Sequence, residues 1–128
     1  MVLPKHMRLK GHKCFDFIYK KGSRFYSSSM VLRVSNANSN LYSKGKNSQI
    51  KPFIKCAISI SNKVSKKSVT RNKLRRLFHH HFTQRFSNMH FDKEVWAFIS
   101  LKPSCMKNSD NNLLKECDKL FIKAGITQ

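Results

Sequence analysis

The sequence predicts one domain of the α+β class, and three observations support this prediction. The chain has 128 residues, a length that suits a single hydrophobic core. Its hydrophobic content of 40% is too high for a disordered basic tail. Segments with the helical spacing of apolar residues are separated by short segments with the alternation of strands. We therefore expect the order helix, three strands, helix, strand, helix over residues 1–128.

The first helix is expected over residues 12–20. Its apolar residues share one side of a helix, namely Cys14, Phe15, Ile18 and Tyr19. Gly22 suits the position just beyond a helix end. Two strands should follow, a short one around 24–26 and an alternating one over 30–35 that form a hairpin. Residues 36–52 are polar and rich in Asn, Ser and Lys, which predicts a mobile loop.

The third strand is expected over residues 53–61, where large and small side chains alternate. Its even-numbered side chains belong in a core, namely Ile54, Cys56, Ile58 and Ile60. The odd-numbered side chains beyond Lys55 are small, namely Ala57, Ser59 and Ser61. By pattern alone, this second face either floors a shallow cleft or simply faces solvent.

The strongest helix signal covers residues 67–86. One stripe of this helix is apolar and contains Leu74, Leu77, Phe78 and Phe82. The adjoining arc is polar and contains Arg71, Asn72, Arg75, Arg76 and His79. Ser68 or Thr70 is expected to cap the start of the helix. A short apolar segment over 94–101 predicts a buried strand, and 110–124 predicts a final helix.

Positive charge is concentrated in the first part of the chain. Residues 1–91 carry 20 Lys and Arg but one acid, Asp16, whereas residues 92–128 carry six Lys and Arg and five acids. A domain with so much charge of one sign repels itself unless a polyanion binds, and nucleic acid is the usual polyanion. A membrane surface is the alternative, but we find neither a lipidation motif nor an apolar run long enough to span a bilayer.

The cysteines and the N-terminal residues bear on the compartment. The four cysteines stand in apolar segments without CxxC spacing, so we expect buried thiols rather than disulfides or zinc ligands. The first residues lack the apolar region of a secretory signal. Together these features predict a cytoplasmic protein.

The sequence offers no catalytic constellation. Its six acids give no convincing carboxylate pair for acid–base catalysis or two-metal hydrolysis. The consecutive residues His79, His80 and His81 would point about 100° apart on a helix, so they cannot converge on one metal ion. We expect His79 and His80 beside the basic face and His81 at the edge of the core.

A binding surface is better supported. A basic segment leads into the long helix and continues along its polar arc, through Lys63, Lys66, Lys67, Arg71, Asn72, Arg75, Arg76 and His79. Arginines along one arc can each contact a phosphate, while the amide of Asn72 offers both a donor and an acceptor. A merely solvated helix would carry Glu among its cations, and this one carries none. Phe15 and Tyr19 lie among basic residues. They are either stacking platforms for single-stranded nucleic acid or part of the hydrophobic core.

Three blocks of sequence, in order, carry a family resemblance. SISNKVSKKSVTRNKLRRLFHHHF has basic residues after a strand and then a helix that opens with Arg-Asn. LPKHMRLKGHKCFDFIYKKG precedes it, and VWAFISLKPS follows it. These blocks resemble the signature, the opening helix and the last strand of the bacterial ribonuclease P protein subunit. The resemblance implies an α+β sandwich with a central sheet and a left-handed β-α-β crossover, similar to the fold of ribosomal protein S5 domain 2.

The resemblance also implies a function. An RNA, with Mg²⁺, would hydrolyse precursor tRNA to give the mature 5′ end, and the protein would be an accessory RNA-binding subunit without catalysis of its own. We call Lys63, Lys66, Lys67, Arg71, Asn72, Arg75, Arg76 and His79 the basic set. The resemblance implies that the basic set faces the catalytic RNA and the cleavage site. A cleft for the 5′ leader would be formed by Phe15, Ile18, Tyr19, Arg33, Ser59 and Ser61. The resemblance implies no tightly bound cofactor and no DNA or membrane partner.

Three positions depart from the family pattern. His79 stands where the family often has another Arg, so that contact would be weaker and sensitive to pH. Arg33 stands where some members have an aromatic residue, which would exchange stacking for charge. Asn62 replaces one of two usual lysines, which leaves Lys63 as the basic residue there. The alternative function is a structural RNA-binding protein of ribosomal type, whereas a self-sufficient nuclease is disfavoured by the missing carboxylates.

Overall fold

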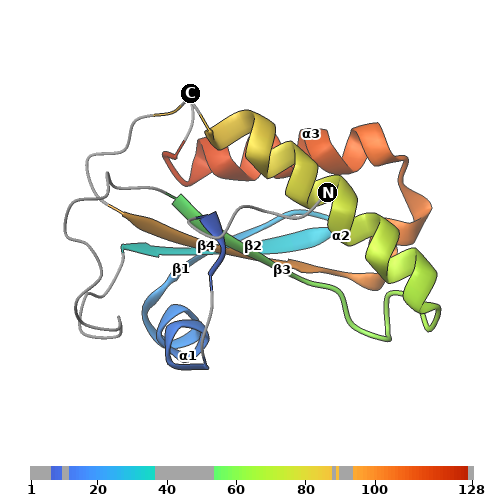
Figure 1. Cartoon of the computed structure of the whole chain (residues 1–128), viewed down its shortest axis with the longest axis horizontal. Coiled ribbons are helices and arrows are strands. Elements are labelled where there is room, and N and C mark those ends of the chain that lie inside the picture. The colour runs from blue at the N-terminus through green and yellow to red at the C-terminus, as the bar shows by residue number, and fades with distance from the viewer. Residues whose placement is uncertain (1–6, 10–11, 37–53, 88, 90–93, 127–128) are drawn as a thin grey trace.

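A computed structural model describes residues 7–9, 12–36, 54–87, 89 and 94–126 (Figure 1). Its elements are, in order, α1 His12–Lys21, β1 Ser23–Tyr26, β2 Met30–Asn36, β3 Ile54–Ser59, α2 Ser68–Phe86, β4 Val95–Leu101, the 3-10 helix η3 Pro103–Lys107 and α3 Asp110–Lys123. The predicted α+β class and element order are therefore confirmed. The predicted loop over 36–52 lies outside the described residues, apart from Asn36 at the end of β2.

The strands form one sheet in the order β1-β2-β4-β3. The β1–β2 and β2–β4 pairs are antiparallel, whereas β3 and β4 are parallel neighbours. Because α2 connects β3 to β4, the predicted β-α-β crossover is present; its left-handed sense stays a prediction. Helices α2 and α3 cover one face of the sheet, and α1 covers part of the other (Figure 1).

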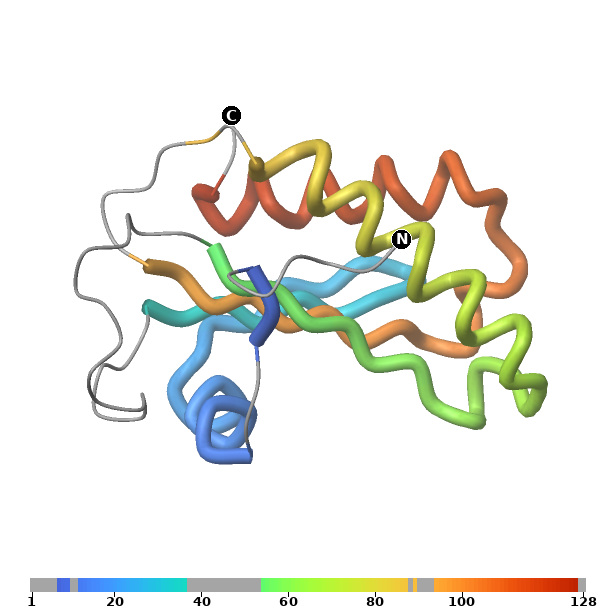
Figure 2. Tube along the Cα trace, viewed as in Figure 1, coloured from blue at the N-terminus to red at the C-terminus, as the bar shows by residue number. Residues whose placement is uncertain are grey.

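The short segment 7–9 lies beside β3, as the dark-blue stretch in Figure 2 shows. The backbone N–H of Leu9 donates to the carbonyl of Cys56 at 3.1 Å, and Arg8 forms a parallel bridge with the same residue. This contact provides hydrogen-bond partners for part of the outer edge of β3, whose backbone groups would otherwise be unpaired.

The main core lies between the sheet and the pair α2 and α3. As predicted, the even-numbered side chains of β3 face this core. Aromatic rings dominate where the two helices meet: Phe86 and Phe121 have centroids 5.0 Å apart, and Phe82 lies 6.0 Å from Phe121. The predicted apolar stripe of α2 is confirmed, with Leu77 partly buried and Phe86 as an additional member. All four cysteines are buried and free, as the sequence predicts.

The start of α2 differs from the prediction. Neither Ser68 nor Thr70 caps the helix: the N-cap is Lys67, which makes no side-chain capping hydrogen bond. The chain enters from an extended conformation at Lys67, so Ser68 already lies within the first turn and cannot cap it. In α3 a serine does cap the helix: the Ser109 hydroxyl accepts a hydrogen bond from the N–H of Asn112 at 3.2 Å.

Gly22 joins α1 directly to β1. Its N–H donates to the Ile18 carbonyl at 2.8 Å. A Cβ at this position would stand 2.5 Å from the same carbonyl oxygen and 3.2 Å from that of Val34. Only glycine permits so close an approach, and the result is that α1 and β1 stay tightly connected on one side of the sheet.

Candidate nucleic-acid interface

The sheet face that carries α1 displays two rows of side chains across all four strands. The strand register gives the first row as Ala57, Phe98, Arg33 and Arg24. It gives the second row as Ser59, Ser100, Val31 and Tyr26. We call these eight residues, together with Phe15 and Tyr19 of α1, the α1 face. Five of the six residues predicted to form the leader cleft belong to this face or border it.

Aromatic rings from α1 rest on one ring of the sheet. The Phe98 ring lies 5.2 Å from Phe15 and 5.7 Å from Tyr19, between centroids. Phe98 itself is buried, Phe15 is partly buried, and Tyr19 is 51% exposed. The sequence left open whether Phe15 and Tyr19 were core or platform. Tyr19 is an exposed ring that packs on Phe98. Phe15 is partly buried, so it belongs both to the core and to the surface.

Ile18 requires a correction. The sequence placed it among the cleft residues, but its exposed fraction is 0%. It packs with Leu9, Cys14 and Trp96 in a small core under α1. Its position on α1, one before Tyr19, turns it towards the sheet rather than outward. Ile18 therefore holds α1 in place and cannot contact a ligand on this surface.

Arg33 lies against Tyr19. The guanidinium carbon is 4.4 Å from the ring centroid, and one guanidinium nitrogen donates to the Ser100 hydroxyl at 3.4 Å. Its Nε is buried without a hydrogen-bond partner. The contacts hold a positive charge beside an exposed aromatic ring, which is a favourable cation–π geometry.

The two predicted floor serines are accessible. Ser59 is partly buried in the second row, next to Ser100 of β4. Ser61 lies beyond the end of β3, is exposed, and accepts from the N–H of Lys63 at 3.2 Å. Ser61 therefore connects the α1 face to the basic segment that leads into α2.

The predicted basic residues lie along that segment and along α2. Lys63, Lys66, Lys67, Asn72 and Arg76 are exposed, while Arg71, Arg75 and His79 are partly buried. Arg71 donates to the Ser65 carbonyl at 2.8 Å, which orders the turn before the helix. Arg75 donates to the Asn72 side-chain carbonyl at 2.7 Å, so the amide nitrogen of Asn72 is left to donate outward.

Carboxylates in the described part of the chain stand elsewhere. The ion pairs there join Lys55 to Glu94 at 4.0 Å and join both His81 and Arg85 to Asp118. None of them involves the predicted basic set. Cations without local carboxylate partners keep their attraction for an external polyanion, and phosphates are the polyanion that Arg recognises best.

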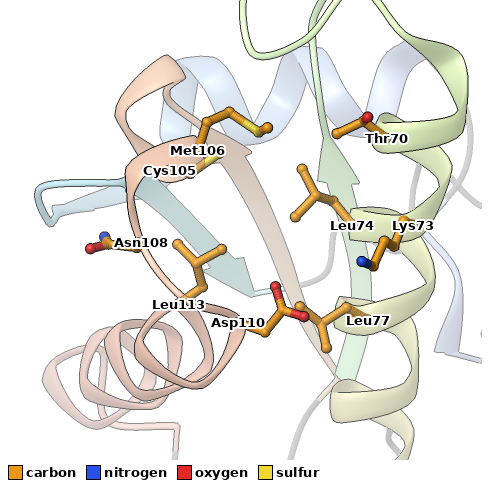
Figure 3. Close-up of a pocket in the computed structure, with 9 residues that line it drawn as sticks. All are labelled: Thr70, Lys73, Leu74, Leu77, Cys105, Met106, Asn108, Asp110 and Leu113. Atoms are coloured by element: carbon orange, nitrogen blue, oxygen red, sulfur yellow. The ribbon is translucent and has the colours of Figure 1, made fainter.

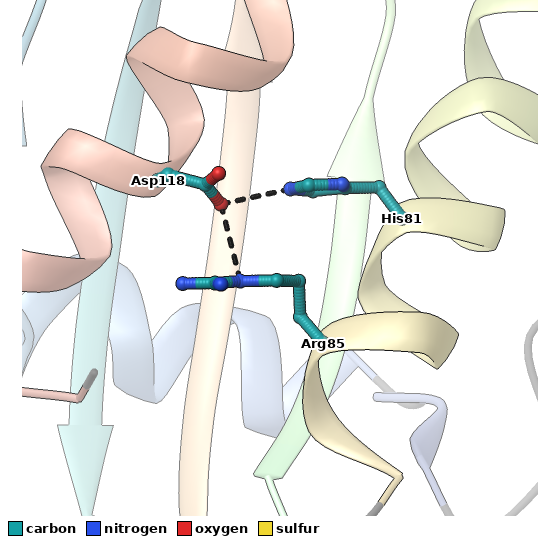
Figure 4. Close-up of polar contacts among 3 residues, drawn as sticks. All are labelled: His81, Arg85 and Asp118. Carbon is teal, nitrogen blue, oxygen red and sulfur yellow. Dashed lines mark hydrogen bonds and ion pairs between the residues drawn. The ribbon is translucent and has the colours of Figure 1, made fainter. Parts of the chain in front are cut away.

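The three consecutive histidines have separate surroundings. Burial, with the charges of Arg75 and Arg8, lowers the pKa of His79 below its usual value of 6.5, so its imidazole is neutral at pH 7. His80 is exposed. His81 points to α3, where its Nε2 lies 2.8 Å from an Asp118 oxygen that also contacts Arg85 at 3.4 Å (Figure 4). The predicted position of His81 at the edge of the core is confirmed.

A small pocket lies on the opposite side of the molecule, between α2, η3 and α3 (Figure 3). Its volume is about 160 Å³, and its walls include Leu74, Lys73 and Asp110. None of the predicted site residues lines it. Among the described residues, no three His, Cys, Asp or Glu side chains gather as metal ligands, and no helix could span a membrane.

Sequence reasoning missed five members of the α1 face, namely Arg24, Tyr26, Val31, Phe98 and Ser100. The apolar segment over 94–101 predicts a strand buried on both faces, and nothing in it tells which residues meet α1. Phe98 and Ser100 became identifiable only once the register paired them with Arg33 and Val31. Alternation puts Phe98 and Ser100 on the same face of β4, because they are two residues apart, but it does not tell whether that face meets α1.

Comparison with known proteins identifies related sequences and structures. The family model named Ribonuclease P matches residues 3–125. The ribonuclease P protein component of Prochlorococcus marinus (strain NATL1A) is 78% identical over 128 residues and is covered completely, as is this chain. The component of Synechococcus sp. (strain WH7803) is 43% identical, with 98% of each chain covered.

The solved structures that resemble this chain include a Staphylococcus aureus RNase P protein mutant with defective mRNA degradation activity. That structure has a TM-score of 0.75 and 20% identity, with 96% of this chain and 92% of that chain covered. At this identity the likeness shows the shared fold alone. The family match and the closely identical relatives show more: this chain belongs to the ribonuclease P protein family and is a protein component of ribonuclease P, which processes tRNA 5′ ends.

Proposed function

We propose that the chain binds the catalytic RNA of ribonuclease P through the basic set and binds the 5′ leader of precursor tRNA through the α1 face. The observation that carries this proposal is the exposed ring of Tyr19, with the Arg33 guanidinium 4.4 Å from its centroid. Exposed rings accept bases of any sequence by stacking, and adjacent cations neutralise the backbone. The combination suits an extended single strand.

The basic set supports the RNA-binding half of the proposal. Its members lie on one continuous stretch of the chain from Lys63 to His79, and the described ion pairs lie elsewhere. Each phosphate that such a cation contacts releases counterions, so association with RNA should weaken steeply with salt. The protein would thereby reduce the repulsion between two RNAs in one complex.

The chemistry is assigned to the RNA. The family resemblance implies that the RNA holds the Mg²⁺ that the holoenzyme requires for phosphodiester hydrolysis. Among the described residues, no three potential metal-ligating side chains gather. The polypeptide would bind and position both RNAs, in the cytoplasm.

Reconstitution tests the proposal. Purified protein is mixed with a bacterial ribonuclease P RNA and a precursor tRNA at low Mg²⁺, where charge repulsion between the RNAs is least screened. We expect the protein to restore cleavage at the mature 5′ end. No increase in cleavage over the RNA alone would contradict it.

Two further arms separate the alternatives. Protein without the catalytic RNA is incubated with precursor tRNA. A second sample contains an mRNA instead, because the Staphylococcus aureus mutant has defective mRNA degradation activity. Cleavage of precursor tRNA in this arm would show a self-sufficient nuclease. Tight binding to the catalytic RNA with no effect on leader recognition would favour a structural protein of ribosomal type.

A further inference from the structure

The α1 face continues past Tyr19 to the outer strand β1. Tyr26 ends the second row of side chains and is 57% exposed. Arg24 ends the first row on the same strand and is also exposed. Tyr26 therefore lies outside the core, and its ring is accessible to a ligand at this edge of the sheet.

Tyr26 has a cation beside it, as Tyr19 does. The Lys102 ammonium lies 5.9 Å from the Tyr26 ring centroid. The same ammonium donates to the Ser27 carbonyl at 3.0 Å, which fixes the lysine next to the ring. Two exposed tyrosines on one face therefore each lie near a positive charge that neighbouring groups hold in place.

The aromatic residues follow one another across the sheet. Phe15 packs in the cluster that contains Ala57 of β3 and Phe98 of β4. Tyr19, one helical turn later, contacts Phe98 and Arg33, which brings it to β2. Tyr26 lies on β1, one strand spacing of about 4.8 Å beyond β2. A strand of nucleic acid that runs along α1 from the β3 side thus reaches Tyr26 after Tyr19.

We propose that Tyr26, with Lys102, forms a further stacking subsite for single-stranded RNA, occupied by leader nucleotides on the β1 side of those at Tyr19. This inference rests on the proposed function. The occupant is assigned by charge, because Arg24, Arg33 and Lys102 line this end of the face. The carboxylate of Glu116, which accepts a hydrogen bond from the Ser28 hydroxyl at 2.5 Å, belongs to α3 on the other face of the sheet.

The experiment measures binding of precursor tRNAs to the holoenzyme as a function of leader length, from no leader to about ten nucleotides. The variants are Tyr26→Ala, Tyr26→Phe, Tyr26→Leu and Tyr19→Ala. Ile122→Ala serves as the matched control, because Ile122 is a 50% exposed apolar side chain on α3. Thermal unfolding of each protein shows whether the fold is kept.

We expect Tyr26→Ala and Tyr26→Leu to weaken binding about 5-fold or more, as loss of one stacking platform does. The loss should begin at a different leader length from that of Tyr19→Ala, because the two rings meet different nucleotides. Tyr26→Phe keeps a ring and should bind as the wild type does. Lys102→Gln should reduce the salt dependence of binding for the same leaders only.

Specific results would overturn the inference. If Tyr19→Ala weakens leader binding and Tyr26→Ala matches Ile122→Ala at every length, Tyr26 is no subsite although the proposed function survives. If the wild type itself does not distinguish leader lengths, the proposed function fails and the inference falls with it. A change in self-association of Tyr26→Ala, measured by sedimentation and without a change in RNA binding, would assign this edge to a second copy of the chain instead.

Discussion

The guanidinium of Arg33 lies 4.4 Å from the centre of the Tyr19 ring, although the two residues belong to different elements, β2 and α1. The contact depends on two supports. Phe98 lies under Tyr19, and Ser100 accepts a hydrogen bond from Arg33. Both supports come from β4, the central strand that contacts β2 and β3. One strand therefore positions the aromatic and the cationic part of the proposed leader site.

The first prediction concerns Tyr19. Tyr19→Ala should reduce the affinity of the holoenzyme for precursor tRNA by about 5- to 150-fold, because one stacking platform is worth about 1–3 kcal/mol. The affinity for mature tRNA should stay unchanged, since mature tRNA has no leader. Parallel binding titrations with both RNAs measure this. Equal losses on both RNAs would show that Tyr19 acts elsewhere, and a large drop in melting temperature would show that it is structural.

The second prediction concerns Arg76, an exposed member of the basic set. Arg76→Ala should weaken binding to ribonuclease P RNA without lowering the melting temperature. The slope of log K against log salt should fall by about 0.7–0.9 in magnitude for the lost phosphate contact. Lys119→Ala removes an exposed charge from α3 and is the matched control. Arg76 would not contact phosphate if both variants gave the wild-type slope.

The third prediction concerns the pH dependence of stability. Burial, with Arg75 and Arg8, lowers the pKa of His79 in the folded protein below the 6.5 of the unfolded chain. The unfolded state therefore binds more protons near and below pH 6.5, and His79 should reduce stability as the pH falls through this range. His79→Asn should lose less stability between pH 7 and pH 5 than the wild type loses. Urea unfolding at a series of pH values measures this, and parallel curves for the two proteins would contradict it.

The fourth prediction concerns the contact between α2 and α3 in Figure 4. Asp118→Asn removes the charge that faces His81 and Arg85, both partly exposed. We expect a loss of about 0.5–1 kcal/mol in the free energy of unfolding, which should shrink at high salt. Asp16→Asn is the control, because Asp16 is exposed and forms no ion pair among the described residues. RNA binding should be unaffected, since the contact lies away from the basic set.

Local patterns predicted the elements well because their causes are local. The stripe of Leu74, Phe78 and Phe82 needs only the helical period, and the alternation in β3 needs only the period of a strand. The helix start was wrong because capping depends on where the chain turns helical. That point is set by the extended backbone at Lys67, so Ser68 came one residue too late to cap.

The candidate site was predictable only in part. Tyr19 and Arg33 were both identified from their surroundings in sequence and from the family resemblance, but their contact with each other was not. Ile18 was wrongly placed on the surface, because one helical side holds both Ile18 and Tyr19 while the sheet buries only one of them. Which of two neighbouring side chains is covered depends on how α1 lies over Trp96 and Phe98, and that is a tertiary property.

The sequence by itself determined the kind of partner and the absence of an evident catalytic constellation. Twenty cations against one acid in residues 1–91 favour a polyanionic partner whatever the fold, because net charge does not depend on the path of the chain. Only the tertiary structure decided where a single strand can stack. Strands distant in sequence pair in the order β1-β2-β4-β3, and this pairing sets Phe98 beneath Tyr19 and places Tyr26 at the end of the same face. Register and strand order arise from long-range packing, which no local period encodes.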